Sequence, residues 1–310
     1  MRYDHAPNLD PGKTRVMRGI AVLACVVGCV APSTSGTLLR WESSPEQLHV
    51  YAALVGTAPD ELSEQIESMN LRDLLPTPPD PLDKDGKAFY LGLQKSIREL
   101  RLSQDLPSVL TLEHDREDSL QLTLRGAEPG PAPPASASTL EKQEYRFRLR
   151  ESKMFQLRAR LSSSGDVQSF YLTQGQKNIP QLIFQLPRGR VEVGDRWPLD
   201  AQLLTVDSRY THDRSSRSSW AQLVQLDAGA NGEGVAGITF FAAESFEGRA
   251  DLPDSSAAAP FRLESTYVAY GELSLETGRW KRYLGELTQR SDGMRPTATL
   301  SRSVHFLQQL

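Results

Sequence analysis

Apolar residues recur at helical spacing in two stretches of the first third of the chain. Residues 61–75 and 84–102 both place apolar side chains three or four positions apart. In the second stretch, lysines and arginines occupy the opposite side. A proline-rich turn at 76–81 separates the two stretches. We therefore expect two helices that cover a hydrophobic core, with inward-facing residues Leu62, Ile66, Met69, Leu74, Phe89, Leu93, Ile97 and Leu100.

From residue 108 onward the pattern changes to alternation, which predicts β-strands with one buried and one exposed face. Residues 144–161 alternate most clearly, with apolar side chains on one side, arginines on the other and a hairpin connection at 151–153. No helical pattern separates this segment from the later ones, so we expect a long antiparallel meander. The later strands are predicted at 197–206, 220–226, 235–246, 261–275, 279–290 and 297–307.

These patterns predict an α+β fold that is mainly β. Several predicted strands exceed ten residues, and a sheet of such strands must twist and curl. The meander is expected to form a curled sheet, a half-barrel or a sandwich, with one or two N-terminal helices. Residues 46–125 are predicted as an N-terminal α+β region and 141–310 as the antiparallel β domain. Between them, residues 126–140 are rich in proline, alanine and serine and are either a domain linker or a long loop.

Residues 1–28 have the features of a signal peptide. Three basic residues precede an apolar run at 19–28, which is much shorter than the roughly 20 residues that span a bilayer. The letters Val26-Val27-Gly28-Cys29 resemble the lipobox of bacterial lipoproteins, which implies that Cys29 receives a diacylglycerol and becomes the mature N-terminus. A competing site ends at Cys25, with a shorter apolar run before it, and Met17 is an alternative start.

Residues 29–45 are expected to be the lipid anchor and its tether, because small and polar residues follow at 31–36. The alternative interpretation is a buried core element at 19–30 with two inert cysteines, but a core element does not explain the polar stretch that follows. Val30 replaces the aspartate that is associated with inner-membrane retention in some enterobacteria. The cell envelope is therefore the predicted location, with the outer membrane favoured over the inner one.

The composition narrows the range of partners. With 35 basic and 39 acidic residues the chain has a formal net charge of -4, which argues against nucleic acid as a partner. Both cysteines lie before residue 30, so the body of the protein has no thiol for a disulfide, a metal cluster or a nucleophile. We expect no cofactor and no metal site.

Two kinds of local motif resemble a binding loop or an acid–base pair, but neither fits the structure that such a site requires. Gly232 to Gly237 matches the letters of a dinucleotide-binding loop, but the residues after it predict a strand instead of the required helix. We interpret residues 227–232 as a hairpin loop. The pairs His114-Asp115 and His212-Asp213 are adjacent, so on a strand the two side chains point to opposite faces and cannot act together. No catalytic residue is predicted.

A longer pattern lies in the second half of the chain. The segments Ile183-Phe-Gln-Leu-Pro187 and Val191-Glu-Val-Gly-Asp-Arg-Trp197 resemble the signature of an uncharacterised family of β-rich bacterial lipoproteins, and Gly271 to Gly278 resembles its later strand-turn-strand hallmark. The resemblance implies an envelope location and a β-rich body, but no activity and no site. From the residues themselves, Gly194 and Asp195 predict a turn, after which Trp197 covers the core.

Two sets of residues are candidates for binding. The first would line a cavity for an apolar ligand in the curled sheet and comprises Phe155, Leu157, Trp197 and Tyr267. The second is either a ladder that holds lipid or cell-wall phosphate, or a solvated strand face paired with acidic neighbours. It comprises Arg146, Arg148, Arg150, Arg158 and Arg160.

The function predicted from the sequence is that of a lipid-anchored, non-enzymatic envelope protein that binds an apolar ligand or a partner protein. One alternative is a structural component of an envelope assembly without a ligand cavity, and another is a hydrolase with an unrecognised site. A lined cavity would favour the ligand, and a filled interior with an exposed apolar patch would favour the assembly. A pocket of histidines and carboxylates would favour the hydrolase.

Overall fold

The computed structural model describes residues 36–41, 48–56, 60–100, 108–116, 118–171, 174–204, 210–228, 233–250, 259–293 and 299–310. Its helices are α1 (Asp60–Ser68), η1 (Leu71–Leu74, a 3-10 helix), α2 (Lys84–Glu99), α3 (Thr139–Ser152) and α4 (Gln174–Phe184). Its strands are β1 (Thr37–Leu38), β2 (Leu48–Gly56), β3 (Ser108–Arg116), β4 (Ser119–Gly126), β5 (Phe155–Ser162), β6 (Val167–Tyr171), β7 (Arg190–Val191), β8 (Arg196–Pro198), β9 (Tyr210–Ala228), β10 (Gly234–Ala250), β11 (Ala259–Ser274), β12 (Arg279–Asp292) and β13 (Thr299–Gln309).

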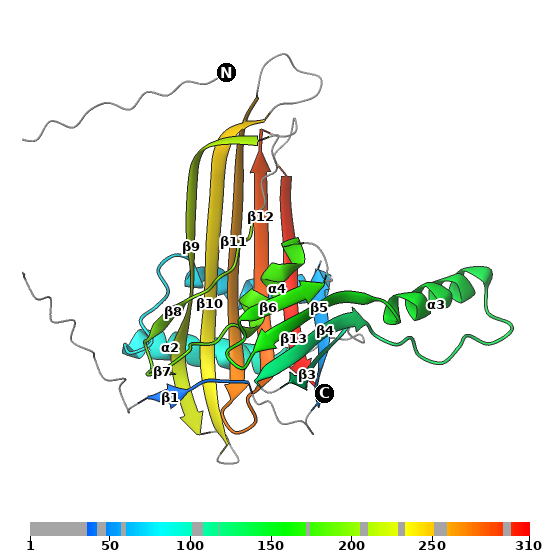
Figure 1. Cartoon of the computed structure of the whole chain (residues 1–310), viewed down its shortest axis with the longest axis horizontal. Helices are drawn as coiled ribbons and strands as arrows, with labels where there is room; N and C mark the ends of the chain where they lie inside the picture. The colour runs from blue at the N-terminus through cyan, green and yellow to red at the C-terminus, as the bar shows by residue number, and fades with distance from the viewer. Residues whose placement is uncertain are drawn as a thin grey trace, which may run out of the picture. The chain divides into compact units, whose positions relative to one another are not determined.

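Eleven of these strands form one open antiparallel sheet in the order β6-β5-β4-β3-β2-β13-β12-β11-β10-β9-β8 (Figure 1). β1 and β7 form a separate pair. In the middle of the large sheet, β13 pairs with both β2 and β12. β4 and β5 also pair directly, so the proline-rich stretch and α3 leave and rejoin the same sheet. The predicted fold, mainly β with a long curled antiparallel sheet and N-terminal helices, is confirmed.

The alternation of the strands gives the sheet two apolar faces. Phe240 belongs to a core that includes residues of α4 and β7 together with Leu39 and Trp41, whereas its neighbour Phe241 belongs to a second core with α1, η1 and α2. We call these the α4 face and the α2 face. Both predicted N-terminal helices are confirmed, since Leu62, Ile66, Leu93 and Ile97 are all buried on the α2 face. The first of them is shorter than expected, because the chain turns at residues 69–70 into η1.

Ion pairs with buried carboxylates fasten the helices to the α2 face. Arg98 of α2 lies 3.0 Å from Glu272, whose side chain is 3% exposed. Arg302 of β13 lies 2.6 Å from Glu67 of α1 and 2.6 Å from Glu286 of β12, whose side chain is 5% exposed. The guanidinium of Arg282 also donates to the backbone carbonyls of residues 97 and 98 at the end of α2. Such groups satisfy carbonyls that a helix C-terminus leaves without intrahelical partners.

The predicted hairpin over 144–161 is wrong in its first half. Residues up to 152 form α3, and only the second half is a strand, β5. A capping box begins α3: Glu141 donates its backbone N–H to Ser138 Oγ (3.2 Å), and Ser138 donates its own to Glu141 Oε2 (2.7 Å). One turn later, Arg148 pairs with Glu144 at 2.6 Å. These local contacts favour a helix over the strand that alternation predicted.

The expectation that no helix interrupts the later meander is also wrong. α4 lies between β6 and β7 and covers the sheet with Leu182, Ile183 and Phe184, all buried. The strand predicted at 197–206 is shorter, because β8 contains only Arg196–Pro198. The chain after β8 follows the sheet edge without regular structure up to residue 204.

The predicted turn before Trp197 is confirmed. Gly194 has a φ of 102°, a backbone conformation that favours glycine. Asp195 accepts a hydrogen bond from the backbone N–H of Glu192 at 2.8 Å, as expected for an aspartate that closes a turn. Trp197 is 7% exposed and donates its indole N–H to the carbonyl of Gln185. The turn therefore sets the indole ring against the core.

Candidate functional site

The strands β9 to β12 extend past α2 and α4, and their far ends form the tip of the sheet (Figure 1). They are 14 to 19 residues long, far longer than the strands at the other side of the sheet. At the tip the apolar pattern of the α2 face gives way to charged side chains. The tip is therefore a polar surface on rigid strands that no described helix covers.

Four charged residues form a continuous row across the tip. Arg214 lies opposite Glu247, Glu247 opposite Arg262, and Arg262 opposite Asp292, one residue from each of four adjacent strands. The sign of the charge alternates along this tip row. Opposite charges directly across a strand pair stabilise the pairing, and only slightly where they are exposed to water. The row therefore adds modest stability and presents an ordered charge pattern to the solvent.

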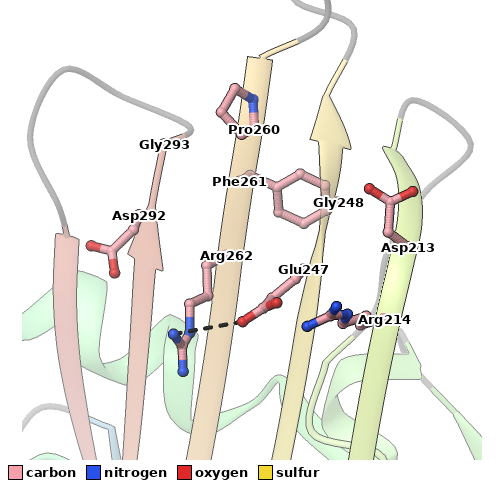
Figure 2. Close-up of a pocket in the computed structure, with 9 residues that line it drawn as sticks. All are labelled: Asp213, Arg214, Glu247, Gly248, Pro260, Phe261, Arg262, Asp292 and Gly293. Carbon is pink, nitrogen blue, oxygen red and sulfur yellow. Dashed lines mark ion pairs between the residues drawn. The ribbon is translucent and has the colours of Figure 1, made fainter.

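A shallow pocket of about 560 Å³ lies at the tip row (Figure 2). Its lining includes the whole row together with Asp213, Gly248, Pro260, Phe261 and Gly293. Gly248 is paired with Phe261 in the register, and the close-up shows the Phe261 ring beside Gly248. The Phe261 ring is 4% exposed, and apart from Pro260 the other side chains that line the pocket are charged.

The charges of the tip row are unequally paired. Arg262 lies 3.6 Å from Glu247 and 2.5 Å from Glu264, and these contacts raise its pKa. Asp292 lies 3.0 Å from Arg290. For Arg214, by contrast, no ion pair is found within the described part of the chain, although its side chain points toward Glu247 in Figure 2. A guanidinium at the end of the row is thus available to an incoming carboxylate or phosphate.

None of the tip residues was predicted as a site. Arg262 lies within a predicted strand, Glu247 and Asp292 lie just after two others, and Arg214 lies six residues before the strand predicted at 220–226. Only the register of four strands places them in one row. A single sequence offers no local signal for this arrangement, because pairing partners are up to some dozens of residues apart.

Three buried side chains in the interior, His305, Tyr267 and Tyr283, form a connected series of polar contacts. His305 Nδ1 lies 3.2 Å from the hydroxyl of Tyr267, which is 2.7 Å from the hydroxyl of Tyr283. Tyr283 donates to the carbonyl of Leu182 in α4 at 3.0 Å. Burial raises the pKa of both tyrosines, so they stay neutral. Gly285 makes room for this series, since a Cβ there would lie 2.3 Å from the Tyr267 hydroxyl.

Acidification is expected to destabilise the protein through His305. Burial lowers its pKa from 6.5 to about 4, so the unfolded chain takes up a proton at a higher pH than the folded one. The stability is complete above pH 6.5 and falls as the pH decreases toward 4. Between pH 7 and 5, His305 alone should cost about 2 kcal/mol of unfolding free energy. Urea unfolding at the two pH values, compared with His305→Gln, measures this difference.

A second histidine acts in the same direction. His49 in β2 is 1% exposed, and neither ring nitrogen has a hydrogen-bond partner among the residues that the structure describes. Burial first, and then the charge of Arg279, lower its pKa to about 4. The variant His49→Gln should therefore also flatten the acid dependence. A pH profile that neither substitution changes would contradict the assignment of these two buried rings.

The four residues predicted to line an apolar cavity are placed differently from one another. Leu157, Trp197 and Tyr267 are buried members of the α4-face core, where the latter two have hydrogen-bond partners in the protein. Phe155 is 47% exposed at the start of β5, with the guanidinium of Arg158 5.8 Å from its ring centroid. The structure thus brings three of them into one core and leaves the fourth at the surface.

The five predicted arginines do not form one ladder. Three of them belong to α3 and two to β5, because the first half of the predicted hairpin is a helix. On β5, Arg158 donates to Gln121, and Arg160 lies 2.5 Å from Asp115. Of the two arginines on β5, Arg160 thus has an acidic neighbour and Arg158 a neutral one. The three on α3, Arg146, Arg148 and Arg150, are exposed.

The two His-Asp pairs both lie in strands. His114 and Asp115 are consecutive in β3, and Asp115 pairs with Arg160 instead of a histidine. Asp213 is exposed in β9, where it lines the tip pocket. In the described part of the chain, no group of three or more histidine, cysteine, aspartate or glutamate side chains is arranged to hold a metal ion.

Of the glycine-rich segment at 232–237, which we set aside as a dinucleotide-binding loop, the residues from Gly234 onward lie in a strand. β10 starts at Gly234 and pairs antiparallel with β9, which ends at Ala228, and residues 229–232 of the predicted hairpin loop lie outside the described residues. The N-terminal predictions, namely the signal peptide at 1–28 and the anchor at Cys29, lie outside the described residues. Among those residues, no helix has both the length and the apolar character needed to cross a bilayer.

Comparison of the chain with protein-family models, with curated proteins and with solved structures finds no match.

Proposed function

We propose that this chain is a lipid-anchored, non-enzymatic protein of the bacterial cell envelope that binds a partner protein at the tip of its sheet. The anchor is a diacylglycerol on Cys29, and the outer membrane is the favoured location. The observation that carries the proposal is the tip row, an ordered set of four alternating charges with a shallow pocket, on strands that extend past the helices. Polar, water-accessible surfaces of this type are common at transient protein interfaces.

A partner protein fits the geometry better than an apolar ligand inside the sheet. Leu157, Trp197 and Tyr267, the predicted cavity residues, are packed in the α4-face core. An apolar ligand there would have to displace side chains whose hydrogen bonds reach α4 and the segment after it. The tip needs no such rearrangement, because its charges are already at the surface.

The anchor would keep the body close to the membrane. Six residues lie between Cys29 and Gly36, the first described residue, so the chain takes seven steps of at most about 3.5 Å each when fully extended. The reach of the tether is therefore about 25 Å at most. A partner of such a body is itself a protein of the same membrane or of the adjacent periplasm.

Site-specific photo-crosslinking in living bacteria tests the proposal. A photoreactive amino acid at Arg214 of the full chain is expected to give a discrete adduct with one protein. The same amino acid at Lys95, a side chain that is 76% exposed on α2, serves as the matched control and should give none. The substitution Glu247→Lys breaks the alternation of charge and should reduce the adduct at position 214 at least fivefold.

Two outcomes would contradict the proposal. Equal adducts at positions 214 and 95, or none at either, would remove the tip as a docking site. Mass spectrometry of the chain extracted from membranes tests the anchor separately, since the N-terminal peptide should start at an acylated Cys29. Stoichiometric lipid that stays bound in the same measurement would favour the apolar-ligand alternative.

A further inference from the structure

Strand β9 is an edge of the large sheet over much of its length. Its outer neighbour, the short strand β8, pairs only with residues 220–222. The chain after β8 adds one hydrogen bond, from the backbone N–H of Leu199 to the carbonyl of Ser219 at 3.4 Å. Toward the tip, no described strand pairs with the outer side of residues 211–218, and β9 is the outermost of the long strands (Figure 1). We call residues 211–218 the free segment of β9.

The backbone of the free segment has hydrogen-bonding groups that point outward. In an antiparallel sheet the N–H and C=O of one residue point to the same side, and successive residues alternate. Because the carbonyl of Ser219 accepts its bond on the outer side, Arg217 and Ser215 must also direct their N–H and C=O outward. Residues 213–218 are all exposed. Such an edge is a template on which another strand can pair.

The side chains of the free segment limit what can pair with it. Residues 213–218 read Asp-Arg-Ser-Ser-Arg-Ser and contain no apolar side chain, so the segment does not favour hydrophobic strands in general. A β-bulge between Arg214 and His212 interrupts the regular strand toward the tip. Charged side chains and bulges are features that keep sheet edges from pairing indiscriminately. The free segment therefore suits a short polar strand with matching charges.

A second copy of the same segment has the required charges. When a twofold axis relates two antiparallel strands, one residue lies opposite its own copy and the others follow in reverse order. An axis at Asp213, Arg214 or Arg217 puts like charges directly opposite each other, which is destabilising. An axis at Ser216 brings no charges together. An axis at Ser215 places Asp213 of each copy opposite Arg217 of the other, and so forms two ion pairs.

The backbone agrees with this register. Ser215 directs its N–H and C=O outward, so opposite its own copy it forms two backbone hydrogen bonds. The ladder ends at the bulge, where the long side chain of Arg217 can still reach the carboxylate of Asp213. Within its own chain, the guanidinium of Arg217 donates to the carbonyl of Ala201 and lies 3.8 Å from Asp200, which is 75% exposed. A guanidinium has five N–H donors, so donors are left for a second carboxylate.

We propose that two copies of the chain join through the free segments of β9, antiparallel, with Ser215 on the twofold axis. The two large sheets then form one continuous sheet. A single strand pair is a small interface, so the association is reversible. The inference does not rest on the partner protein proposed above, because the pairing uses the sheet edge and leaves the tip row on the α2 face exposed. In the photo-crosslinking experiment, an adduct with twice the mass of the chain would be this dimer.

Disulfide trapping in the full chain tests the register. Opposite residues of a hydrogen-bonded pair have Cα atoms about 5.5 Å apart, a separation that a disulfide can bridge. On oxidation, Ser215→Cys is therefore expected to form an intermolecular disulfide. The matched control is Ser216→Cys, which is also exposed but would be a diagonal neighbour of its own copy at about 7–8 Å, beyond that reach. Its yield should be at least fivefold lower. Both variants retain Cys25 and Cys29, so disulfides through these would form equally.

Charge reversal in the Ser215→Cys background tests the two ion pairs. Arg217→Glu puts a carboxylate opposite Asp213 of the other copy and should lower the disulfide yield at least fivefold. Adding Asp213→Arg restores opposite charges and should recover the yield. Circular dichroism of each variant checks that the chain is folded. Equal yields from Ser215→Cys and Ser216→Cys, no disulfide from either, or no recovery in the charge-swapped variant would overturn the proposal.

Discussion

Replacing Trp280 by alanine is expected to lower the free energy of unfolding by about 3–5 kcal/mol. Trp280 is fully buried in the α4-face core, and its ring centroid lies 5.4 Å from Trp41, 5.9 Å from Phe240 and 5.3 Å from Tyr283. Its indole N–H also donates to the carbonyl of Ile183 at 3.1 Å. Alanine would leave a cavity among three rings and an unsatisfied carbonyl. Urea unfolding followed by circular dichroism measures the loss.

Trp220→Ala is the matched control. Trp220 is only partly buried, near the sheet edge, where it contacts Phe241 and the guanidinium of Arg196. Its removal should therefore cost clearly less than the removal of Trp280. Equal losses for the two variants would show that the aromatic cluster around Trp280 is not the centre of the core. The variant Gly271→Ala gives a second measure, since its Cβ would lie 2.7 Å from the Trp280 ring.

Replacing Arg302 by methionine is expected to cost about 3–5 kcal/mol, although Arg302 is itself partly exposed. The reason is Glu286, which is 5% exposed and lies 2.6 Å from the guanidinium. Without Arg302 this carboxylate is a buried charge without its partner. The same guanidinium pairs at 2.6 Å with Glu67, which is 55% exposed. Glu67→Gln should therefore cost far less than Arg302→Met, because an ion pair in water contributes little.

The double variant Arg302→Met with Glu286→Gln separates the two explanations of the loss. If the cost comes from the unpaired buried charge, the second substitution should recover most of the stability. If Arg302→Met and Glu67→Gln are equally destabilising, or if the double variant is worse than the single one, the buried pair is not the cause. Thermal and urea unfolding of the four chains at one pH give the comparison.

The fold class could be predicted because, over most of the chain, the spacing of the apolar residues agrees with which side chains are buried. The helices around Ile66 and Ile97 and the strands after residue 108 have the apolar spacing that their packing requires. α3 was missed because Tyr145, Phe147 and Leu149 alternate with arginines as a strand would. Ser138 and Glu141 have the spacing of a capping box, which indicates the start of a helix. The prediction followed the alternation of the later residues instead.

α4 was missed for a different reason. Pro180 lies within it, and an internal proline argues against a helix when only local preference is considered. The burial of Leu182, Ile183 and Phe184 against the sheet outweighs that cost. The tip row could not be predicted at all, because it exists only through the register of four strands. Long-range pairing of this kind leaves no local trace in one sequence.

The place of β13 constrains how the protein is assembled. It follows all other described strands in the chain, yet it lies sixth among the eleven strands of the sheet, between β2 and β12. Until β13 is inserted, each of these two neighbours is a bare edge that invites pairing with another molecule. A newly made chain would therefore be prone to pair with other molecules until its final segment is in place, and a copy truncated before residue 299 would be a seed for aggregation.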